Sequence, residues 1–413
     1  MPVRLLHTAD WHVGKRLHGV SRDDEHRAVL AEMADLATRH EVDAVVVAGD
    51  LFDQPNPSAE ASTLVHEGLL ALREAAGRLV VVTGNHDSPR RWLAVDGLLR
   101  AAGIDLIAEV RPPEDGGRVT IRGRDGSECD LIGLPWIFER RLARTATALG
   151  IPPAGDYREG MRGVLAHLCA AQRDRGVPQV LVGHAHLGEA EVGPDARLLP
   201  AGGSHAIPAG VFPESLSYVA LGHIHKPQRL TGAAVPTHYA GSPLQLDFGE
   251  AGEGKSVCLV DVEPGRPAAV RELGLTDGRP LTRLRGTLDE LEEQQVHADH
   301  DCWLGVTVRC TRAEPGLADR AREICPRAIA IDIDPLERPV PERRSRPSVR
   351  GLGPRALFRQ YLIDARGAED PPEADLDLFE EVLSGVEHDD GAADGVAGVQ
   401  LELAHPEDAT GTR

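Results

Sequence analysis

Seven segments within residues 1–262 share one pattern, in which a short run of Val, Leu, Ile and Ala ends abruptly in polar residues. Runs of this length, bounded by Gly, Asp or Asn, are typical of β-strands that are buried on both faces. The pattern therefore predicts central strands with polar clusters at their ends. The segments are VRLLHTADWH (3–12), DAVVVAGD (43–50), RLVVVTGNHD (78–87), CDLIGLPW (129–136), PQVLVGHAH (178–186), SYVALGHIH (217–225) and THYAGSP (237–243).

Helical patterns separate the first of these strands. In residues 22–40 and 58–77 the apolar side chains recur every three or four positions, as they do on one face of a helix. Gly77 is a residue type that commonly follows the last turn of a helix. Because strand and helix alternate, we predict an α/β fold with a largely parallel sheet. In such sheets ligands bind beyond the carboxyl ends of the strands, which is where the polar clusters fall.

The chain changes in character after the predicted α/β domain of residues 1–262. Residues 278–336 combine strand and helix patterns and predict a small α+β module. Residues 337–353 are rich in Pro and Arg without periodicity, which predicts a linker. Residues 354–386 contain two short helical patterns with more apolar residues than isolated helices expose, and residues 387–413 are acidic and rich in Gly and Ala, which predicts disorder.

Composition limits the function classes. The 413 residues are 41% hydrophobic, which suffices for two or three globular domains. No stretch approaches the roughly 18 uninterrupted apolar residues of a membrane helix, and the N-terminus lacks a signal-peptide pattern, so we expect a cytoplasmic protein with no membrane association. The six cysteines are far apart and form no CxxC pair, which predicts buried free thiols rather than a zinc ribbon or a disulfide scaffold.

The net charge of −20 argues against a chain that holds polyanions through bulk electrostatics. The excess is unevenly distributed, however. From Gly351 onward there are 15 acidic residues against 4 arginines and no lysine, a net charge of −11. The body of the chain is only mildly acidic, so a nucleic acid substrate remains compatible with the sequence.

Polar side chains at five predicted strand ends suggest a metal site. Asp10 and His12, like His223 and His225, are two residues apart, so on extended backbone each pair points the same way. Imidazoles, carboxylates and an amide without thiolate suit Mn, Fe or Zn rather than Ca. Taken singly, each residue is explained as a turn-forming residue or as a buried, hydrogen-bonded side chain. Burying so many polar groups together without an ion, however, costs free energy of folding. The candidates are Asp10, His12, Asp50, Asn85, His86, His184, His186, His223 and His225.

The motifs DWH, GDLFD, GNHD and GHIH occur in this order with βαβ-sized spacings and resemble the signature of the calcineurin-like metallophosphoesterases. More narrowly, HTADWHVGKRLHG, LPW, YVALGHIHKPQ, YAGSPLQLDFGE and GTLDEL resemble the SbcD family of nuclease subunits, up to about residue 385. The resemblance implies a four-layer sandwich of two mixed β-sheets flanked by helices. It also implies a capping domain at residues 278–336 and helices at 354–386 that bind a partner; the competing interpretation is that these helices pack back on the capping domain.

The activity that the resemblance implies is hydrolysis of DNA phosphodiesters with two divalent metal ions, Mn2+ by preference. Members of the family act as 3′–5′ double-strand exonucleases and as single-strand or hairpin endonucleases in DNA repair, recombination and replication. They work with SbcC, an ATPase with a long coiled coil, as a homodimer within a heterotetramer. This chain contains no GxxxxGK[ST] phosphate loop, so any ATP dependence comes from another chain.

The family's ligand pattern can be carried over motif by motif. It implies two metals joined by one bridging carboxylate, a water made nucleophilic between them, and phosphate oxygens neutralised by the ions. The first metal is assigned to Asp10, His12 and His225, the second to Asn85, His184 and His223, and the bridge to Asp50.

Residues beside these ligands receive supporting roles. His86 remains free to donate a proton to the leaving oxygen or to stabilise the transition state. Asp53 and Asp87 are predicted to orient histidines. GHAH offers both His184 and His186, and the resemblance favours His184, which directly follows the strand-ending Gly.

Cationic residues near the motifs are candidates for phosphate contacts of DNA. Lys15 and Arg16 follow the first motif, and Arg90 and Arg91 follow GNHD. A solvated surface is the competing interpretation for all four, and Trp92 suits either core packing or base stacking. His7, His205 and His238 carry no motif and are interpreted as structural.

Two other functions compete with the nuclease. A stand-alone phosphodiesterase or phosphatase on small phosphoesters would share the metal core but would not need residues 280–385. Protein phosphatases of the wider family carry an Arg close after the bridging Asp, and GDLFDQPNP has none. A non-catalytic scaffold for the ATPase would tolerate the loss of metal ligands, whereas every expected position here is filled.

Overall fold

The computed structural model describes residues 2–152, 154–170, 176–191, 206–297, 301–312, 314–336, 354–366 and 372–388. The chain divides into two units, Met1–Leu336 and Glu337–Arg413. The predicted linker at 337–353, nearly all of the predicted disordered tail, and His205 lie outside the described residues.

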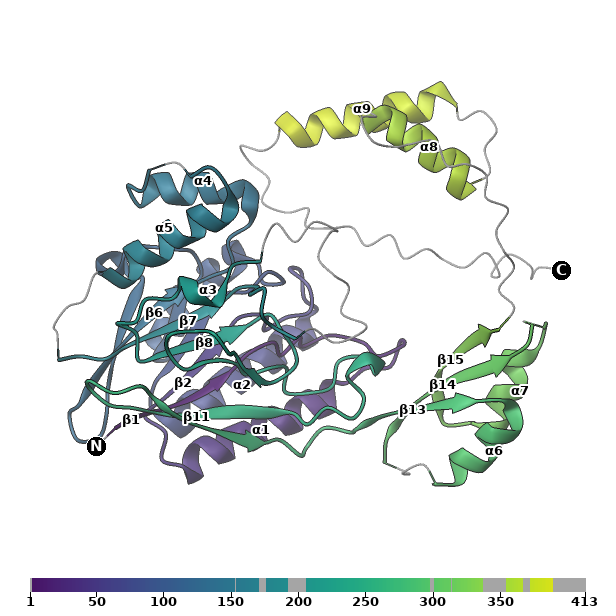
Figure 1. Ribbon diagram of the computed structural model, residues 1–413, viewed down its shortest axis with the longest axis horizontal. Coiled ribbons are helices and arrows are strands. Elements are labelled where there is room, and N and C mark those ends of the chain that lie inside the picture. The colour runs from purple at the N-terminus through teal and green to yellow at the C-terminus, as the bar shows by residue number, and fades with distance from the viewer. Residues whose placement is uncertain are drawn as a thin grey trace. The chain divides into compact units, whose positions relative to one another are not determined.

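Two six-stranded mixed sheets form the centre of the first unit (Figure 1). In the first sheet β1 to β4 are parallel and β11 and β12 are antiparallel additions at one edge. Its order is β12 (Ala269–Gly274), β11 (Ser256–Val262), β1 (Val3–Thr8), β2 (Ala44–Ala48), β3 (Leu79–Val82) and β4 (Ile104–Ile107). The second sheet's order is β5 (Arg118–Arg122), β6 (Glu128–Leu134), β7 (Gln179–His184), β8 (Tyr218–Gly222), β10 (Thr237–Tyr239) and β9 (Gln228–Arg229).

Every residue of β2 is buried, because its two faces enter different cores. Val45 and Val47 pack against the helices outside the first sheet, whereas Val46 packs between the two sheets. The outer helices of the first sheet are α1 (Asp23–Arg39), α2 (Ala59–Ala76) and α3 (Pro89–Ala101), and those of the second are α4 (Glu139–Ala148) and α5 (Tyr157–Ala170). The predicted four-layer sandwich is therefore confirmed.

The ends of α2 follow from its sequence. Ser58 accepts a hydrogen bond from the backbone N–H of Ala61 at the N-terminus, and Gly77 adopts φ 75° at the C-terminus, as the helical pattern predicted. Short 3-10 turns occur at η1 (Pro113–Asp115), η2 (Ala209–Val211) and η3 (Phe248–Glu250). All six cysteines are free thiols, and five of them are buried.

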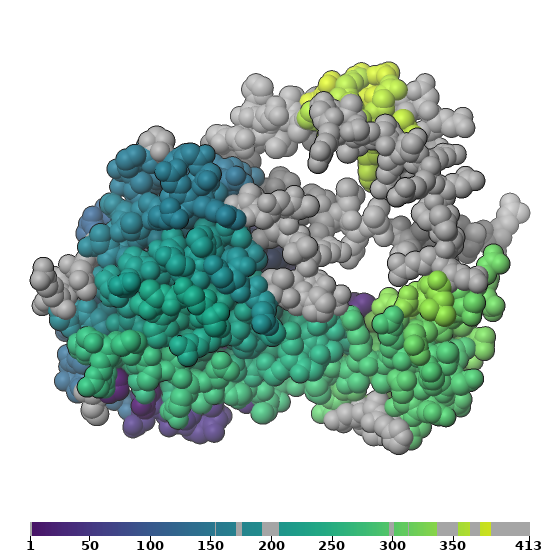
Figure 2. All heavy atoms as spheres, viewed as in Figure 1, coloured from purple at the N-terminus to yellow at the C-terminus, as the bar shows by residue number. Residues whose placement is uncertain are grey.

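Residues 281–335 form a small parallel sheet with two helices and a core of their own. In the space-filling view they make a lobe that adjoins the larger body (Figure 2). Phe248 of the larger body packs against Leu281 and Ala330 of this module. The elements are β13 (Leu281–Gly286), α6 (Leu288–His297), β14 (Trp303–Cys310), α7 (Leu317–Ile324) and β15 (Ala328–Pro335).

The second unit contains α8 (Pro354–Arg366) and α9 (Glu373–His388). The two helices pack through stacked rings of Phe358 and Phe379, whose centroids are 4.3 Å apart. Arg355 of α8 pairs with acidic residues of α9, including Glu380 at 2.7 Å. None of the helices in the described part of the chain has the length and apolar character needed to cross a bilayer.

Candidate metal centre

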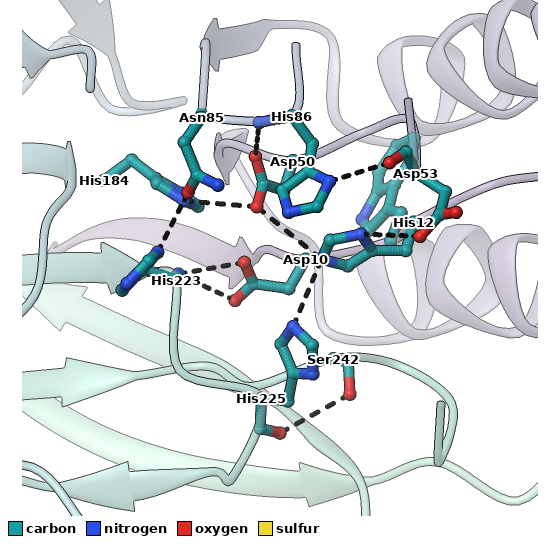
Figure 3. Close-up of polar contacts among 12 residues, drawn as sticks. Asp10, His12, Asp50, Asp53, Asn85, His86, His184, His223, His225 and Ser242 are labelled. Carbon is teal, nitrogen blue, oxygen red and sulfur yellow. Dashed lines mark hydrogen bonds and ion pairs between the residues drawn. The ribbon is translucent and has the colours of Figure 1, made fainter. Parts of the chain in front are cut away.

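The predicted ligands meet in one crevice at the carboxyl ends of strands from both sheets (Figure 3). The first sheet supplies the residues that follow β1, β2 and β3, and the second supplies the last residue of β7 and those that follow β8. The ligands come from segments that are far apart in the chain, so the crevice exists only because the two sheets pack together. The residues brought together are Asp10, His12, Asp50, Asn85, His86, His184, His223 and His225.

The backbone at the crevice is unusual. Asp10, His12, Asp50 and His223 have φ values of 53°, 46°, 54° and 105°, in the region that favours glycine. Asp10 and His12 do present their donors toward one point, as expected. The means is not strand alternation, however, since β1 ends at Thr8 and both residues adopt left-handed conformations. Such conformations cost about 1–3 kcal/mol each and persist where the surroundings impose them.

The first predicted metal group is compact. Asp10, His12 and His225 each offer a ligand atom within 4.8 Å of the others, and the Nε2 atoms of the two imidazoles are 3.1 Å apart. The other ring nitrogen of each histidine faces a carboxylate. His12 Nδ1 lies 3.5 Å from Asp53 Oδ1, and His225 Nδ1 lies 2.9 Å from Glu250 Oε1. With Nδ1 as the protonated atom, two Nε2 lone pairs face one another, and a cation satisfies that arrangement.

The second predicted group surrounds the amide of Asn85. Its Oδ1 lies 3.0 Å from His184 Nε2 and 2.9 Å from His223 Nδ1. His184 Nδ1 donates to the carbonyl of Ala48 at 2.7 Å, which directs Nε2 toward Asn85 and Asp50. Asp50 Oδ2 lies 3.3 Å from this Nε2. The amide oxygen and both ring nitrogens therefore converge on one point beside Asp50.

Asp50 lies between the two groups. The same Oδ2 atom that approaches His184 lies 3.6 Å from His12 Nε2, which belongs to the first group. Asp50 is 2% exposed, and its other oxygen, Oδ1, accepts a hydrogen bond from the backbone N–H of His86 at 2.8 Å. This is the place that a bridging carboxylate requires.

His86 is half-buried, whereas Asp50 beside it is buried. The Nδ1 atom of His86 donates to the carbonyl of Asp53 at 2.7 Å, so Nε2 is the ring nitrogen that carries the lone pair. Its ring centroid is 4.7 Å from that of His12. His186, the alternative to His184, contacts His223 edge-on at 5.5 Å between centroids. Of the two GHAH histidines, the structure brings His184 beside Asp50 and Asn85.

Asp53 and Asp87 support the centre in different ways. Asp53 faces the Nδ1 atom of His12, as the prediction that it orients a histidine requires. The carboxylate of Asp87 accepts from the backbone N–H groups of Gly84 and Asp50, both at 2.9 Å, and of Leu51 at 3.2 Å. Instead of orienting a histidine, as the sequence interpretation expected, Asp87 therefore fixes the loop that carries Asp50.

The charges of the crevice are strongly coupled. Burial raises the pKa of Asp10 to about 6 and lowers that of His12 to about 4. Burial also lowers the pKa of His184, but the Asp50 carboxylate prevails and raises this pKa to about 9. Asp50 keeps a pKa below its ordinary range despite its burial, because His184 favours the carboxylate. Buried carboxylates and imidazoles at these distances fit a divalent cation well.

The sequence interpretation missed two residues of the site. The indole of Trp136, in the LPW motif, stacks on the ring of His223 with centroids 4.7 Å apart and an interplanar angle of 28°. Glu250 contacts His225, as described above. Both lie in segments that resemble the SbcD family, which was the available signal, but their contacts depend on tertiary structure.

The candidate DNA-binding cations have local contacts, and that of Lys15 is with a residue of the site. Lys15 Nζ is 3.5 Å from Asp53 Oδ1. Arg16 donates to the carbonyl of Gly19 in its own loop, and Arg91 lies 3.4 Å from Asn56 Oδ1. Arg16, Arg90 and Arg91 are exposed and Lys15 is half-buried, so their side chains remain within reach of a ligand.

Three residues left open by the sequence have structural positions. Trp92 is 2% exposed and packs against Phe52 in the core, which excludes base stacking in this conformation. His7 is fully buried, with Nδ1 3.0 Å from the hydroxyl of Tyr218. His238 is also buried, in line with its structural interpretation.

Comparison with known families agrees with this fold. Residues 3–227, more than half of the chain, match the family described as calcineurin-like phosphoesterase. Residues 277–365 match a second family, described as type 5 capsule protein repressor C-terminal domain. The fold and the site thus define a hydrolase of the calcineurin-like phosphoesterase class.

Individual relatives identify the family within this class. The SbcD subunit of the SbcCD nuclease of Bacillus subtilis is 32% identical over 94% of this chain and 100% of its own length. Its counterpart in Rhodobacter capsulatus is 36% identical over 68% of this chain and 71% of its own length. The counterpart in Escherichia coli K12 is 30% identical over 74% of this chain and 78% of its own length. The chain belongs to the SbcD family of SbcCD nuclease subunits.

Proposed function

We propose that this chain is a Mn2+-dependent DNA nuclease that cleaves double-stranded ends in the 3′–5′ direction and cuts single strands and hairpins endonucleolytically. It acts with an SbcC-type ATPase in the processing of DNA breaks and hairpins. The observation that carries the proposal is the position of Asp50 between two groups of converging nitrogen and oxygen donors. A cytoplasmic location is part of the same proposal.

The residues of the crevice have separate roles in the proposed reaction. Bound divalent ions supply a nucleophilic water and neutralise charge on the phosphate. Asp10, His12 and His225 would hold one ion, Asn85, His184 and His223 would hold the other, and Asp50 would be the ligand that the two groups share. His86 lies close enough to His12 and Asp50 to join a metal group. Because the family's ligand pattern leaves it out of both sets, we assign it instead to proton exchange with the leaving oxygen of the DNA strand, through Nε2.

The surroundings of the crevice determine access to DNA. Lys15, Arg16, Arg90 and Arg91 contact backbone phosphates of the DNA. Such contacts position the strand without reading its sequence, in keeping with a nuclease that acts on ends and hairpins. Because the chain as a whole carries a charge of −20, these local cations matter more than the overall field.

The second unit binds the partner. The helices α8 and α9 pack on each other and still leave Leu357, Tyr361 and Leu378 exposed by 41%, 37% and 59%. An apolar surface on a two-helix unit suits the coiled coil of an SbcC-type ATPase. The assembly that we propose is a homodimer of this chain within a heterotetramer, with the sheet module at 278–336 acting as a capping domain over DNA.

The test is cleavage of end-labelled duplex and hairpin DNA by the purified full chain with Mn2+, with and without the ATPase and ATP. Asp50→Ala should lose both cleavage and bound metal, because it removes the donor shared by both groups. His86→Ala should lose cleavage and keep the metal. His186→Ala is the matched control, since it changes a neighbouring histidine outside the ligand sets, and it should keep both.

A small phosphodiester distinguishes the competing function. Bis-p-nitrophenyl phosphate should be hydrolysed by the same variants that cut DNA. Hydrolysis of this compound without DNA cleavage, even with the ATPase and ATP present, would replace the nuclease by a stand-alone phosphodiesterase. Labels at the 3′ and 5′ ends of separate duplexes report the direction of exonuclease action.

A further inference from the structure

The ligand His225 is held from behind by a buried acid. Glu250 Oε1 lies 2.9 Å from His225 Nδ1, and the Glu250 side chain is only 8% exposed. Since the carboxylate accepts the Nδ1 proton, the tautomer is fixed and the Nε2 lone pair is directed into the crevice, 3.1 Å from His12 Nε2. Ligand histidines commonly have such a carboxylate partner, which orients the ring and makes it more basic.

Glu250 is itself held by several donors. Its second oxygen, Oε2, accepts from Lys255 Nζ at 2.7 Å and from the backbone N–H of Leu246 at 3.0 Å. Lys255 Nζ also donates to the carbonyl of His225 at 3.0 Å, so one ammonium group contacts both the acid and the ligand residue. Burial would raise the pKa of Glu250, but His225 and Lys255 lower it to about 2, and the acid is a carboxylate at neutral pH.

The segment that carries Glu250 is anchored outside the metal centre. Two residues earlier, the ring of Phe248 packs on Leu281 and Ala330 of the small C-terminal sheet. A Cβ atom at Gly305 of this sheet would lie 2.9 Å from the Phe248 ring, so the absence of a side chain there permits the contact. Gln245 Oε1 accepts from the backbone N–H of Leu281 at 2.6 Å.

We propose that Glu250 is a positioning residue for the metal ligand His225, held by Lys255 and by the packing of Phe248 against the small C-terminal sheet. The inference rests on the two-metal centre of the proposed function. Its consequence is selective: the ion held by His225 depends on Glu250, whereas the ion held by the other group does not.

The experiment is a titration of the metal-free full chain with Mn2+, in which electron paramagnetic resonance measures the concentration of free Mn2+ at each step. Glu250→Gln keeps the size of the side chain and removes its charge. We expect it to weaken one of the two Mn2+ sites about 10- to 100-fold and to leave the other unchanged. Glu253→Gln is the matched control, because Glu253 also pairs with Lys255, at 3.2 Å. This variant should bind both ions as the unaltered chain does.

Two further variants exclude an indirect effect on folding. Glu250→Gln combined with Lys255→Met removes the ammonium that would otherwise be left buried without its partner, and it should show the same selective loss. In a His225→Ala background, Glu250→Gln should weaken Mn2+ binding no further, because its effect passes through the imidazole.

Three results would overturn the inference. They are unchanged Mn2+ binding by Glu250→Gln, equal weakening of both sites, and a further loss of the same size in the His225→Ala background. The readout is metal binding rather than cleavage. Selective loss of one ion in a chain that cuts no DNA would therefore support the role of Glu250 and refute the nuclease.

Discussion

Gly84→Ala tests how closely the crevice is built around Asp50. A Cβ atom at residue 84 would lie 2.1 Å from Asp50 Oδ1 and 2.5 Å from the backbone nitrogen of Asp50. Nonbonded atoms ordinarily stay about 3.5 Å apart, so the carboxylate or its loop must move by about 1 Å. The loop cannot yield freely, because Asp87 accepts from the N–H groups of Asp50 and Leu51.

The expected loss of activity follows from this displacement. Misplacing a reacting group by about 1 Å costs about 100-fold in rate, and Asp50 is the donor that both ions would share. We expect Gly84→Ala to reduce the Mn2+-dependent hydrolysis of bis-p-nitrophenyl phosphate about 100-fold and to weaken both Mn2+ sites. Overpacking of this kind destabilises a fold by about 1–3 kcal/mol, so the variant should remain folded.

Gly210→Ala is the control for this experiment. Gly210 is exposed, and a Cβ atom there would have no neighbour within 4 Å, so rate and metal affinity should not change. The assays are initial rates at saturating Mn2+, calorimetric titration with Mn2+, and thermal unfolding of both variants. If Gly84→Ala bound Mn2+ and hydrolysed the diester as the unaltered chain does, the close packing around Asp50 would have no functional importance.

Three other predictions concern neighbouring parts of the structure. Trp136→Phe should abolish most of the quenching of intrinsic fluorescence by Mn2+, since this indole stacks on the ligand His223; quenching that persisted in the variant would contradict the arrangement. Trp303→Phe removes a 2.8 Å hydrogen bond to Glu25 and should destabilise the chain to thermal unfolding by about 1 kcal/mol, unless the bond is absent in solution. In the folded chain the pKa of Glu250 is lowered from its ordinary value of 4.5 to about 2. The ionised Glu250 therefore stabilises the fold by about 3 kcal/mol above pH 4.5, and this stabilisation is lost as the pH falls toward 2. The free energy of unfolding should consequently fall less steeply with acid in Glu250→Gln than in the unaltered chain.

The sandwich was predictable because its strands are buried on both faces. A strand such as β2 reads as an unbroken apolar run, and the acid that follows it marks the end of the strand. The side chains of Asp50 and His184 meet because the ends of β2 and β7 lie at the same edge of the packed sheets. The meeting of these residues therefore follows from topology alone, without knowledge of side-chain conformations.

The means by which the ligands are aimed could not be predicted. Asp10, His12 and Asp50 adopt left-handed backbone conformations, for which only glycine gives a strong signal in sequence. The two-residue spacing suggested strand alternation, a local rule that stops applying once β1 has ended at Thr8. Tertiary hydrogen bonds replace it: Asp10 N–H donates to the carbonyl of Gly49 at 2.9 Å and His12 N–H to that of Asp50 at 3.0 Å.

The contacts of Glu250 and Trp136 had no local signature either. An acid in a 3-10 turn and an indole after a strand are common, and their importance comes from partners more than 20 residues away in the chain. The reverse holds for Trp92, which follows the GNHD motif beside two arginines and yet packs into the core. Proximity to a motif in sequence is thus a weaker guide to function than the direction in which a side chain leaves its element.

Small residues at the strand ends connect the stability of the sandwich with its chemistry. A Cβ atom at Gly222 would lie 2.0 Å from the carbonyl oxygen of Ala48, and one at Gly49 would lie 2.4 Å from His184 Nδ1. The ends of β2, β7 and β8 approach this closely only because no side chain separates them. That approach also lets His184 Nδ1 donate to Ala48 and present Nε2 to Asp50. The packing of the two sheets and the orientation of this ligand are therefore one structural feature, and a change that separates the sheets at this edge also displaces the ligand.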